Sequence, residues 1–405
     1  MLRRTFTALL AGAFATLMPA AGAIADDQKP IRIGVLNDQN GYQSSITGKG
    51  SVIAAELAVQ DFGGHVNGRK VEVVSADHQN KPDVGAGVAR RWYESDGVDA
   101  IVDVPNSAVG LAVVEVTRQA NKTLLLTSAS SSDITGKNCS PNTVQWAQDS
   151  YEVANGGPAM IIKEGGDSWF FITIDYAFGH ATERDTTAVI EKSGGKVLGS
   201  VKHPPNAGDF SSFLLQAQSS GAKIIGISSA GDDMANAIRQ AQEFGITAGG
   251  QKIALLTPAV FNFVHGLGLD ISQNLLLTET TYWDLNDQTR AFATRFQERH
   301  GAMPSAMQMD VYSVVFHYLK SLAASKVDPE NGVEVVKAMR AEPGDSYGSP
   351  ASVREDGRVV RDLYLFQVKT PAESTGEWDV YKLVRAIPAA EVTHPLSKEC
   401  PLVGN

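Results

Sequence analysis

The stretch Ile31-Arg32-Ile33-Gly34-Val35-Leu36 is a short apolar run that gives way to polar residues, a pattern typical of a buried parallel strand. Similar runs follow at intervals, and a longer helical pattern separates each run from the next. The further strands are expected at 71–75, 100–104 and 123–127, and the helices at 51–62, 83–94 and 107–120. This alternation predicts a doubly wound α/β unit with a parallel sheet.

A second series of the same kind begins near residue 169. Strands are expected at 169–174, 196–201, 224–228 and 253–256, with helices near 180–193, 210–219 and 232–244. A chain of 405 residues exceeds one ordinary core, so the two series predict two α/β lobes. A strand at 275–278, helices around 288–300, 305–325 and 332–339, and a β-rich tail follow. Within this tail, Glu355-Asp356-Gly357-Arg358 predicts a hairpin turn.

The first 25 residues have the pattern of a secretory signal peptide. Arg3 and Arg4 precede an apolar stretch over residues 9–18, and Ala23-Ile24-Ala25 fits a cleavage site. The apolar stretch is shorter than the roughly 20 residues that span a bilayer. We therefore expect cleavage near Ala25 and a periplasmic protein, exported by either the general secretory or the twin-arginine route.

Charge and cysteine content narrow the function classes. The net charge is -10, and it becomes -12 once Arg3 and Arg4 are removed with the signal peptide. No long basic run remains, which argues against a nucleic-acid partner. The two cysteines, Cys139 and Cys400, predict one disulfide in an oxidising compartment, and two free buried thiols are the alternative.

Polar loops follow three strands of the first series, where parallel α/β sheets bind their ligands. Tyr42 and Ser44 lie in the loop after the first strand, and Ser107 begins the helix after the 100–104 strand. The loop after the 123–127 strand supplies four further candidates, namely Ser128, Ala129, Ser130 and Ser131. Each loop alone is an ordinary cap or turn, but three neighbouring loops with hydroxyls and helix starts indicate an anion site, such as one for a carboxylate.

Catalytic and cofactor motifs are missing from the sequence. It has no H-E-x-x-H helix and no Walker A loop, and Gly226-Ile227-Ser228-Ser229-Ala230-Gly231 misses the G-x-S-x-G elbow by one residue. Its eight histidines are scattered without metal-ligand spacing. We therefore expect a binding protein with neither cofactor nor metal, and we disfavour an α/β enzyme.

Aromatic residues in further loops are candidates to shape the ligand pocket. Phe178 follows the first strand of the second series, Phe261 lies after its last strand, and Tyr151 follows the first lobe. Each of these rings could equally fill a core. Several rings in one cleft would favour a flat or apolar ligand body.

The chain resembles type I periplasmic binding proteins, and within them the leucine/isoleucine/valine-binding group of ABC importers. The similarity rests first on Ile31–Leu36, with Ala54-Ala55-Glu56-Leu57-Ala58 and Val66-Asn67-Gly68-Arg69-Lys70-Val71. It continues through Asp175-Tyr176-Ala177-Phe178-Gly179, Ala207-Gly208-Asp209-Phe210-Ser211 and Ile238-Arg239-Gln240-Ala241. The tail Tyr364-Leu365-Phe366-Gln367-Val368-Lys369 and the end Cys400-Pro401-Leu402-Val403 are similar to a subgroup of aromatic-acid binders.

This resemblance implies the lobe organisation and the partners. Three hinge crossings would join a first lobe of 26–147 plus 281–344 to a second lobe of 148–280 plus 345–405. The family holds its ligand carboxylate with first-lobe loops, which are Ser107 and residues 128–131 here. Phe178 stands where relatives place a pocket tyrosine, and Asp232 lies in a ligand-side loop. The resemblance also implies that the protein is a monomer and delivers its ligand to an ABC permease in the inner membrane.

One departure from the family concerns the ligand. Amino-acid binders of this group carry an acidic residue in the loop after the fourth second-lobe strand, which pairs with the ligand ammonium. This chain reads Thr257-Pro258-Ala259-Val260-Phe261 there. A buried unpaired ammonium is costly, so we expect an aromatic or other non-amino carboxylate unless Asp232 or Asp149 substitutes. An amino-acid or amide binder and a periplasmic sensor subunit are the alternatives.

Overall fold

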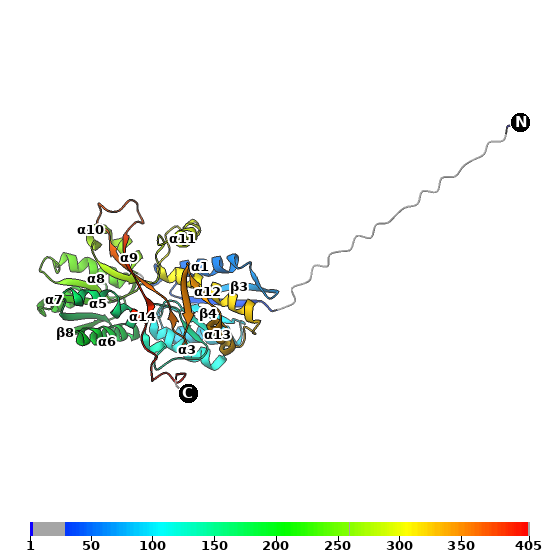
Figure 1. Cartoon of the computed structure of the whole chain (residues 1–405), viewed down its shortest axis with the longest axis horizontal. Coiled ribbons are helices and arrows are strands. Elements are labelled where there is room, and N and C mark those ends of the chain that lie inside the picture. Colours follow the sequence, from blue (N-terminus) through cyan, green and yellow to red (C-terminus); the bar gives the residue numbers. More distant parts are fainter. Residues whose placement is uncertain (3–28, 259, 404–405) are drawn as a thin grey trace.

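The computed structural model describes residues 1–2, 29–258 and 260–403, so the predicted signal peptide lies outside the described part apart from its first two residues. Figure 1 shows two lobes side by side, with segments of the C-terminal tail running between them. Over the described ranges, no helix has the length and apolar character needed to cross a membrane.

The first lobe is built on a six-stranded sheet in the order β2-β3-β1-β4-β5-β6. All neighbouring strands are parallel except the short β2, which pairs antiparallel with β3. In chain order the strands are β1 (Ile31–Asn37), β2 (His65–Val66), β3 (Arg69–Asp77), β4 (Ala100–Asp103), β5 (Thr123–Leu126) and β6 (Thr143–Gln145). The sequence pattern did not predict β6, because three residues are too few to show a period.

Helices cover both faces of this sheet. On one face, α1 (Gly48–Asp61), α11 (Asp287–His300), α12 (Ala306–Ser325) and α13 (Gly332–Ala341) share a core with Ile31, Ile33 and Val35 of β1. On the other face, α2 (Pro82–Glu94) and α3 (Ser107–Ala120) pack over Leu36 and Ile101. Because strand side chains alternate between faces, the apolar residues of β1 are buried on both sides of the sheet, and only Arg32 of this strand is partly exposed.

The second lobe is built on a four-stranded parallel sheet in the order β10-β9-β7-β8. Its strands are β7 (Ser168–Ile174), β8 (Lys196–His203), β9 (Ile224–Ser228) and β10 (Lys252–Leu255). Its helices are α4 (Ser150–Asn155), α5 (Gly157–Lys163), α6 (Ala177–Lys192), α7 (Ser211–Ser219), α8 (Gly231–Glu243), α9 (Phe261–Leu267) and α10 (Leu269–Ser272). Both series therefore form the α/β lobes that the alternation predicted.

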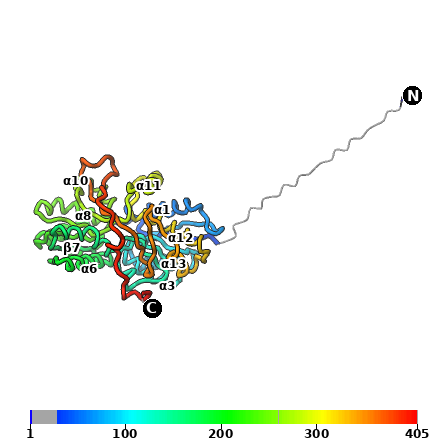
Figure 2. The backbone as a smooth tube through the Cα atoms, in the orientation of Figure 1, coloured from blue at the N-terminus to red at the C-terminus, as the bar shows by residue number. Residues whose placement is uncertain are grey.

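Up to β16, the chain passes between the lobes three times. The crossings lie between β6 and α4, between β11 (Leu276–Glu279) and α11, and between β14 (Val359–Val360) and β15 (Leu363–Val368). An antiparallel sheet in the order β11-β15-β16, with β16 at Tyr381–Ile387, adds Phe366, Val368 and Tyr381 to the second-lobe core. Figure 2 shows the backbone of the tail where it crosses between the lobes.

The expected boundary at residue 344 is wrong. The strands β12 (Gly344–Ser346), β13 (Ser349–Val353) and β14 contribute Tyr347, Ala351, Val353 and Val359 to the first-lobe core. They pack there because the predicted hairpin turn lies beside β6. At this point the backbone amide of Gln145 donates to the Gly357 carbonyl at 2.9 Å. The first lobe therefore extends to about residue 360, and the tail returns to the second lobe only from β15.

The end of the chain returns once more to the first lobe. After the short helix α14 (Ala389–Val392), Cys400 forms a disulfide with Cys139, with a Cα–Cα distance of 5.5 Å. The structure thus contains the predicted bridge. It closes a loop between residues 261 positions apart, and so ties the tail beyond β16 to the first lobe.

Candidate functional site

The start of α3 and the loop after β5 are joined through Ser107. Asn106 caps α3, because its Oδ1 accepts hydrogen bonds from the Ala108 and Val109 amides at 2.9 and 3.3 Å. The Ser107 Oγ is buried and accepts from the backbone amides of Ser130 and Ser131, both at 3.1 Å. Because both bonds use the oxygen as acceptor, the Ser107 hydroxyl hydrogen remains for another acceptor, such as a carboxylate oxygen.

The loop 128–131 is held in shape by its own residues and by the strands beneath it. Ser130 Oγ donates to the Ser128 carbonyl at 3.1 Å, and Ser131 Oγ caps the short 3-10 helix Ser132–Ile134. Below the loop, the Gln145 Nε2 donates to the carbonyls of Ala129 and Ser131 at 2.9 and 3.0 Å. The predicted serine cluster therefore exists, but most of its hydroxyls position the loop itself.

Asp103 anchors this edge of the sheet and was not predicted. Its carboxylate accepts from Ser128 Oγ at 2.5 Å, Thr127 Oγ1 at 3.1 Å and Asn37 Nδ2 at 2.9 Å. Complete burial raises the pKa of Asp103. Asp103 and Val104 also have φ angles of 85° and 57°, which is rare for a non-glycine residue and above all for a β-branched one. Strained backbone conformations of this kind cluster at functional sites in proteins.

Aromatic residues of the two lobes meet across the cleft. Tyr42 packs with Phe178, Ile174 and Ala230, and Tyr176 lies against this cluster. The Asp232 amide donates to the Tyr42 carbonyl at 3.0 Å. Tyr42 is buried, and burial raises the pKa of its phenol to about 12. The structure thus brings together Tyr42, Phe178 and Asp232, three of the predicted site residues.

Other contacts hold the lobes together along the same cleft. Asn262 Nδ2 of the second lobe donates to the Ser45 carbonyl at 3.2 Å, next to the half-buried Ser44. Arg184 of α6 pairs with Asp133 at 2.9 Å. Burial, followed by the charge of Asp38, raises the pKa of Asp232, so this carboxylate is a poor partner for further negative charge. The described structure therefore has its lobes in contact around the cleft.

Two predicted pocket residues lie in other surroundings. Phe261 is 2% exposed and packs against the rings of Tyr282, Trp378 and Tyr381, with centroids 5.6 to 6.0 Å away. It therefore belongs to the second-lobe core. Tyr151 has its ring 5.8 Å from that of His394. For both residues, a direct role in ligand binding stays a prediction.

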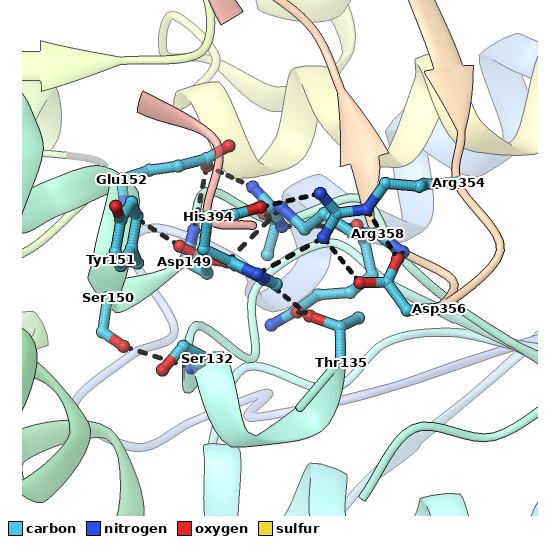
Figure 3. Close-up of polar contacts among 12 residues, drawn as sticks. Ser132, Thr135, Asp149, Ser150, Tyr151, Glu152, Arg354, Asp356, Arg358 and His394 are labelled. Carbon is cyan, nitrogen blue, oxygen red and sulfur yellow. Dashed lines mark hydrogen bonds and ion pairs between the residues drawn. The ribbon is translucent and has the colours of Figure 1, made fainter. Parts of the chain in front are cut away.

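A buried charge cluster occupies the first crossing, and Figure 3 shows it beside Tyr151. Arg358, on the hairpin turn, forms ion pairs with Glu152 and with Asp149, the second at 3.4 Å. Asp149 and Glu152 also form a capping box at the start of α4. His394 Nε2 lies 3.5 Å from Asp149. Burial and the neighbouring Asp149 outweigh Arg358 and raise the pKa of Glu152 to about 7.

A small cavity lies where the crossings meet the cleft. Its volume is only about 10 Å³, room for about one water molecule, and its lining joins first-lobe, crossing and second-lobe residues. These are Thr127, Gln148, Pro258, Glu279, Thr280, Ala306, Met307 and Asp310. Asp310 is neutralised there by Arg361, whose two terminal nitrogens donate to its carboxylate at 2.6 and 2.7 Å.

Glu279 supplies a carboxylate beside the loop after β10, where the sequence itself has no acidic residue. Its side chain is 1% exposed, lines this cavity beside Pro258 and accepts from the Val260 amide at 2.8 Å. A carboxylate is therefore present next to that loop, supplied by the end of β11. Sequence reasoning missed it because Glu279 lies 20 positions from the expected place, and only the fold brings it there.

Comparisons with known proteins agree with this architecture. A family model described as "Periplasmic binding protein" matches residues 30–376. A periplasmic binding protein from Burkholderia mallei is 41% identical, with a TM-score of 0.89, 93% of this chain covered and 99% of that one. A branched chain amino acid ABC transporter periplasmic ligand-binding protein from Burkholderia xenovorans is 34% identical, with a TM-score of 0.81 and coverages of 92% and 99%.

A more distant neighbour shares the fold alone. It is the solute binding protein of an ABC transporter from R. palustris in complex with benzoate, 19% identical with a TM-score of 0.78. The alignment covers 89% of this chain and 97% of that one. The family model spans most of the chain, and the neighbours are binding proteins rather than enzymes. This chain belongs to the periplasmic binding protein family.

Proposed function

We propose that this protein is the solute-binding subunit of an ABC importer and captures a small carboxylate by closing its two lobes around it. The observation that carries the proposal is the buried Ser107 hydroxyl, placed at the start of the 14-residue helix α3. A helix start attracts negative charge through its dipole and its first amides. The hydroxyl hydrogen adds a directed donor at the same point, which suits a carboxylate oxygen.

Closure is supported by the contacts between the lobes. The Tyr42 carbonyl meets the Asp232 amide, and the Phe178 and Tyr42 side chains share one apolar cluster. Two crossings line one cavity, and Arg361 of the third pairs with Asp310 there, so the three crossings form a hinge on which two rigid lobes can turn. The closed form would then be the one that the permease recognises. A monomeric subunit that docks on an inner-membrane permease remains a prediction.

An aromatic acid is the first candidate ligand. Tyr42, Tyr176 and Phe178 place aromatic rings at the cleft, and such rings favour a flat apolar body. The fold neighbour from R. palustris holds benzoate, although its low identity makes it a guide to fold only.

An amino acid or amide is the second candidate, and Glu279 favours it. A buried carboxylate at the cavity could pair with a ligand ammonium, which removes the reason for rejecting a zwitterion. The 34% identical relative from B. xenovorans is described as belonging to a branched chain amino acid transporter.

Calorimetry with matched ligand pairs tests the proposal. Benzoate against benzamide isolates the carboxylate, and leucine against 4-methyl-2-oxopentanoate isolates the ammonium. We expect a carboxylate to bind and its amide to bind at least about tenfold more weakly, as a lost charge-assisted hydrogen bond implies. Equal binding of acid and amide would contradict the proposal. A preference for leucine over its oxo acid would select the second candidate.

A further inference from the structure

Gln148 has an unusual position in the first crossing. Its side chain lines the cavity between the lobes and is 3% exposed. Neither its Nε2 nor its Oε1 has a hydrogen-bond partner among the described residues. Burying both ends of a primary amide without partners is costly, and native proteins rarely retain such a group without a use for it.

The other polar side chains of this cavity are already engaged. Thr127 Oγ1 donates to Asp103 at 3.1 Å, and Thr280 Oγ1 donates to Asp310 at 3.0 Å. Asp310 also pairs with Arg361, and Glu279 accepts the Val260 amide. Within this cavity, Gln148 is the side chain with both a donor and an acceptor left to offer.

The neighbouring strand ends of the second lobe add two more hydroxyls of the same kind. Ser228 and Ser229 are fully buried, and their Oγ atoms also lack partners within the described structure. Ser228 is the last residue of β9, and Ser229 follows it. The neighbouring strand β10 leads to Pro258 at the cavity, and just after β10 the Leu256 backbone amide donates to the Ile227 carbonyl at 2.9 Å. The residue that follows Ser229, Ala230, packs against Tyr42 and Phe178 at the cleft.

We infer that the ligand carries a second polar group that both donates and accepts hydrogen bonds, a hydroxyl or an amide, and that Gln148 recognises it. This inference rests on the proposed function, because it describes a further feature of the same ligand. An amide side chain offers one donor and one acceptor, which a hydroxyl or a carboxamide complements and a hydrocarbon leaves unpaired. Unsubstituted benzoate and the aliphatic branched-chain amino acids would therefore bind more weakly than their hydroxylated analogues.

The physical basis of the discrimination is the penalty for an unpaired buried group. A site built to hydrogen-bond a substrate hydroxyl rejects the analogue that lacks it, because the polar groups of the site then stay buried without partners. Replacing Gln148 with leucine removes both unpaired atoms at similar volume. The ligand-free Gln148→Leu variant should therefore be at least as stable as the wild type.

The experiment titrates the full mature protein with benzoate, 4-hydroxybenzoate and phenol, and with valine and threonine. The wild type should bind the hydroxylated member of at least one carboxylate pair roughly tenfold or more tightly, and Gln148→Leu should abolish that preference. Gln218→Leu, an exposed glutamine of α7, is the matched control and should keep the wild-type preference. A melting temperature for ligand-free Gln148→Leu at or above that of the wild type shows that the variant folds.

The outcomes separate the two proposals. Phenol bound as tightly as 4-hydroxybenzoate would overturn the carboxylate and leave the hydroxyl. If benzoate and valine each bind as well as the hydroxylated partner, the role of Gln148 is overturned and the carboxylate is left. A hydroxyl preference that survives in Gln148→Leu would also overturn it, as would a panel in which no hydroxylated carboxylate binds.

Discussion

Two residues of the candidate site, Ser107 and Asp103, each have two structural or functional roles. Ser107 both orders the loop 128–131 through two amides and has its hydroxyl hydrogen left for a ligand. Asp103 fixes Ser128 and Thr127 while it holds a strained backbone. Sequence reasoning predicted Ser107 and its loop from strand ends and caps. It missed Asp103, Gln148 and Glu279, because their importance depends on burial and on neighbours distant in sequence.

Ser107→Ala tests the first of these residues. We expect the substitution to weaken carboxylate binding by about 1–3 kcal/mol, because it removes a hydrogen bond to a charged group. It should also lower the melting temperature, since the Ser130 and Ser131 amides lose their acceptor. Calorimetry and thermal unfolding measure the two effects. Ser321→Ala, another buried serine, is the control for stability alone. Unchanged affinity in Ser107→Ala would remove it from the site.

Glu152 should make stability depend on pH. Burial and Asp149 raise its pKa from 4.5 to about 7, so the folded protein holds this proton more tightly than the unfolded chain between those values. The contribution of Glu152 to the free energy of unfolding should therefore fall as pH rises from 4.5 to about 7, by at most about 1.4 kcal/mol per pH unit.

Urea unfolding of wild type and Glu152→Gln across this pH range isolates the effect. The stability of the wild type relative to the variant should decrease with rising pH, and should level off above pH 7. Glu164→Gln, at an exposed glutamate after α5, should show no such trend. A wild type that gains stability over Glu152→Gln as pH rises would show that Arg358 dominates this carboxyl.

At the scale of elements, the tail contributes strands to both lobes, which its sequence pattern did not predict. The hairpin around Gly357 was predicted from its turn residues, and it forms between β13 and β14. Its placement beside β6 was not predicted, because Gly357 meets Gln145 through backbone atoms, which leave no side-chain pattern in the sequence. The two α/β lobes, in contrast, followed from the alternation of buried runs and helices.

The disulfide acts at this scale by tying the last segment to the first lobe. The double substitution Cys139→Ser and Cys400→Ser should lower the free energy of unfolding by up to roughly 5 kcal/mol, because the bridge closes a very long loop. Urea unfolding measures this loss, and ligand affinity should change little because the site residues keep their contacts. An unchanged free energy of unfolding would contradict this expectation, because it would mean that the bridge does not restrict the unfolded chain.

At the scale of the whole molecule, function depends on how closely the lobes approach. Gly231 marks the contact, since a Cβ atom there would lie 1.8 Å from the Tyr42 carbonyl oxygen. Its φ of 57° further disfavours a side chain. Periodicity predicted two lobes, and family resemblance supplied their interleaving. Neither could give the distance between them, which follows from the packing of the loops at the cleft.

Gly231→Ala should therefore hinder closure. We expect weaker ligand binding and a larger radius of gyration in the presence of ligand, measured by calorimetry and small-angle X-ray scattering. Gly245→Ala is the matched control, because its φ of 65° imposes similar strain and no atom lies within 4 Å of the added Cβ. If both variants bind equally well, the contact at Tyr42 is not needed for closure.

The most direct test of the central claim is a crystal structure of the mature protein with the tightest-binding acid of the titration panel. The account predicts the ligand between the lobes, with a carboxylate oxygen within hydrogen-bond distance of Ser107 Oγ and the closed contact between Tyr42 and Asp232 retained. A ligand bound outside the cleft, or one whose carboxylate points away from Ser107 and the loop 128–131, would contradict it.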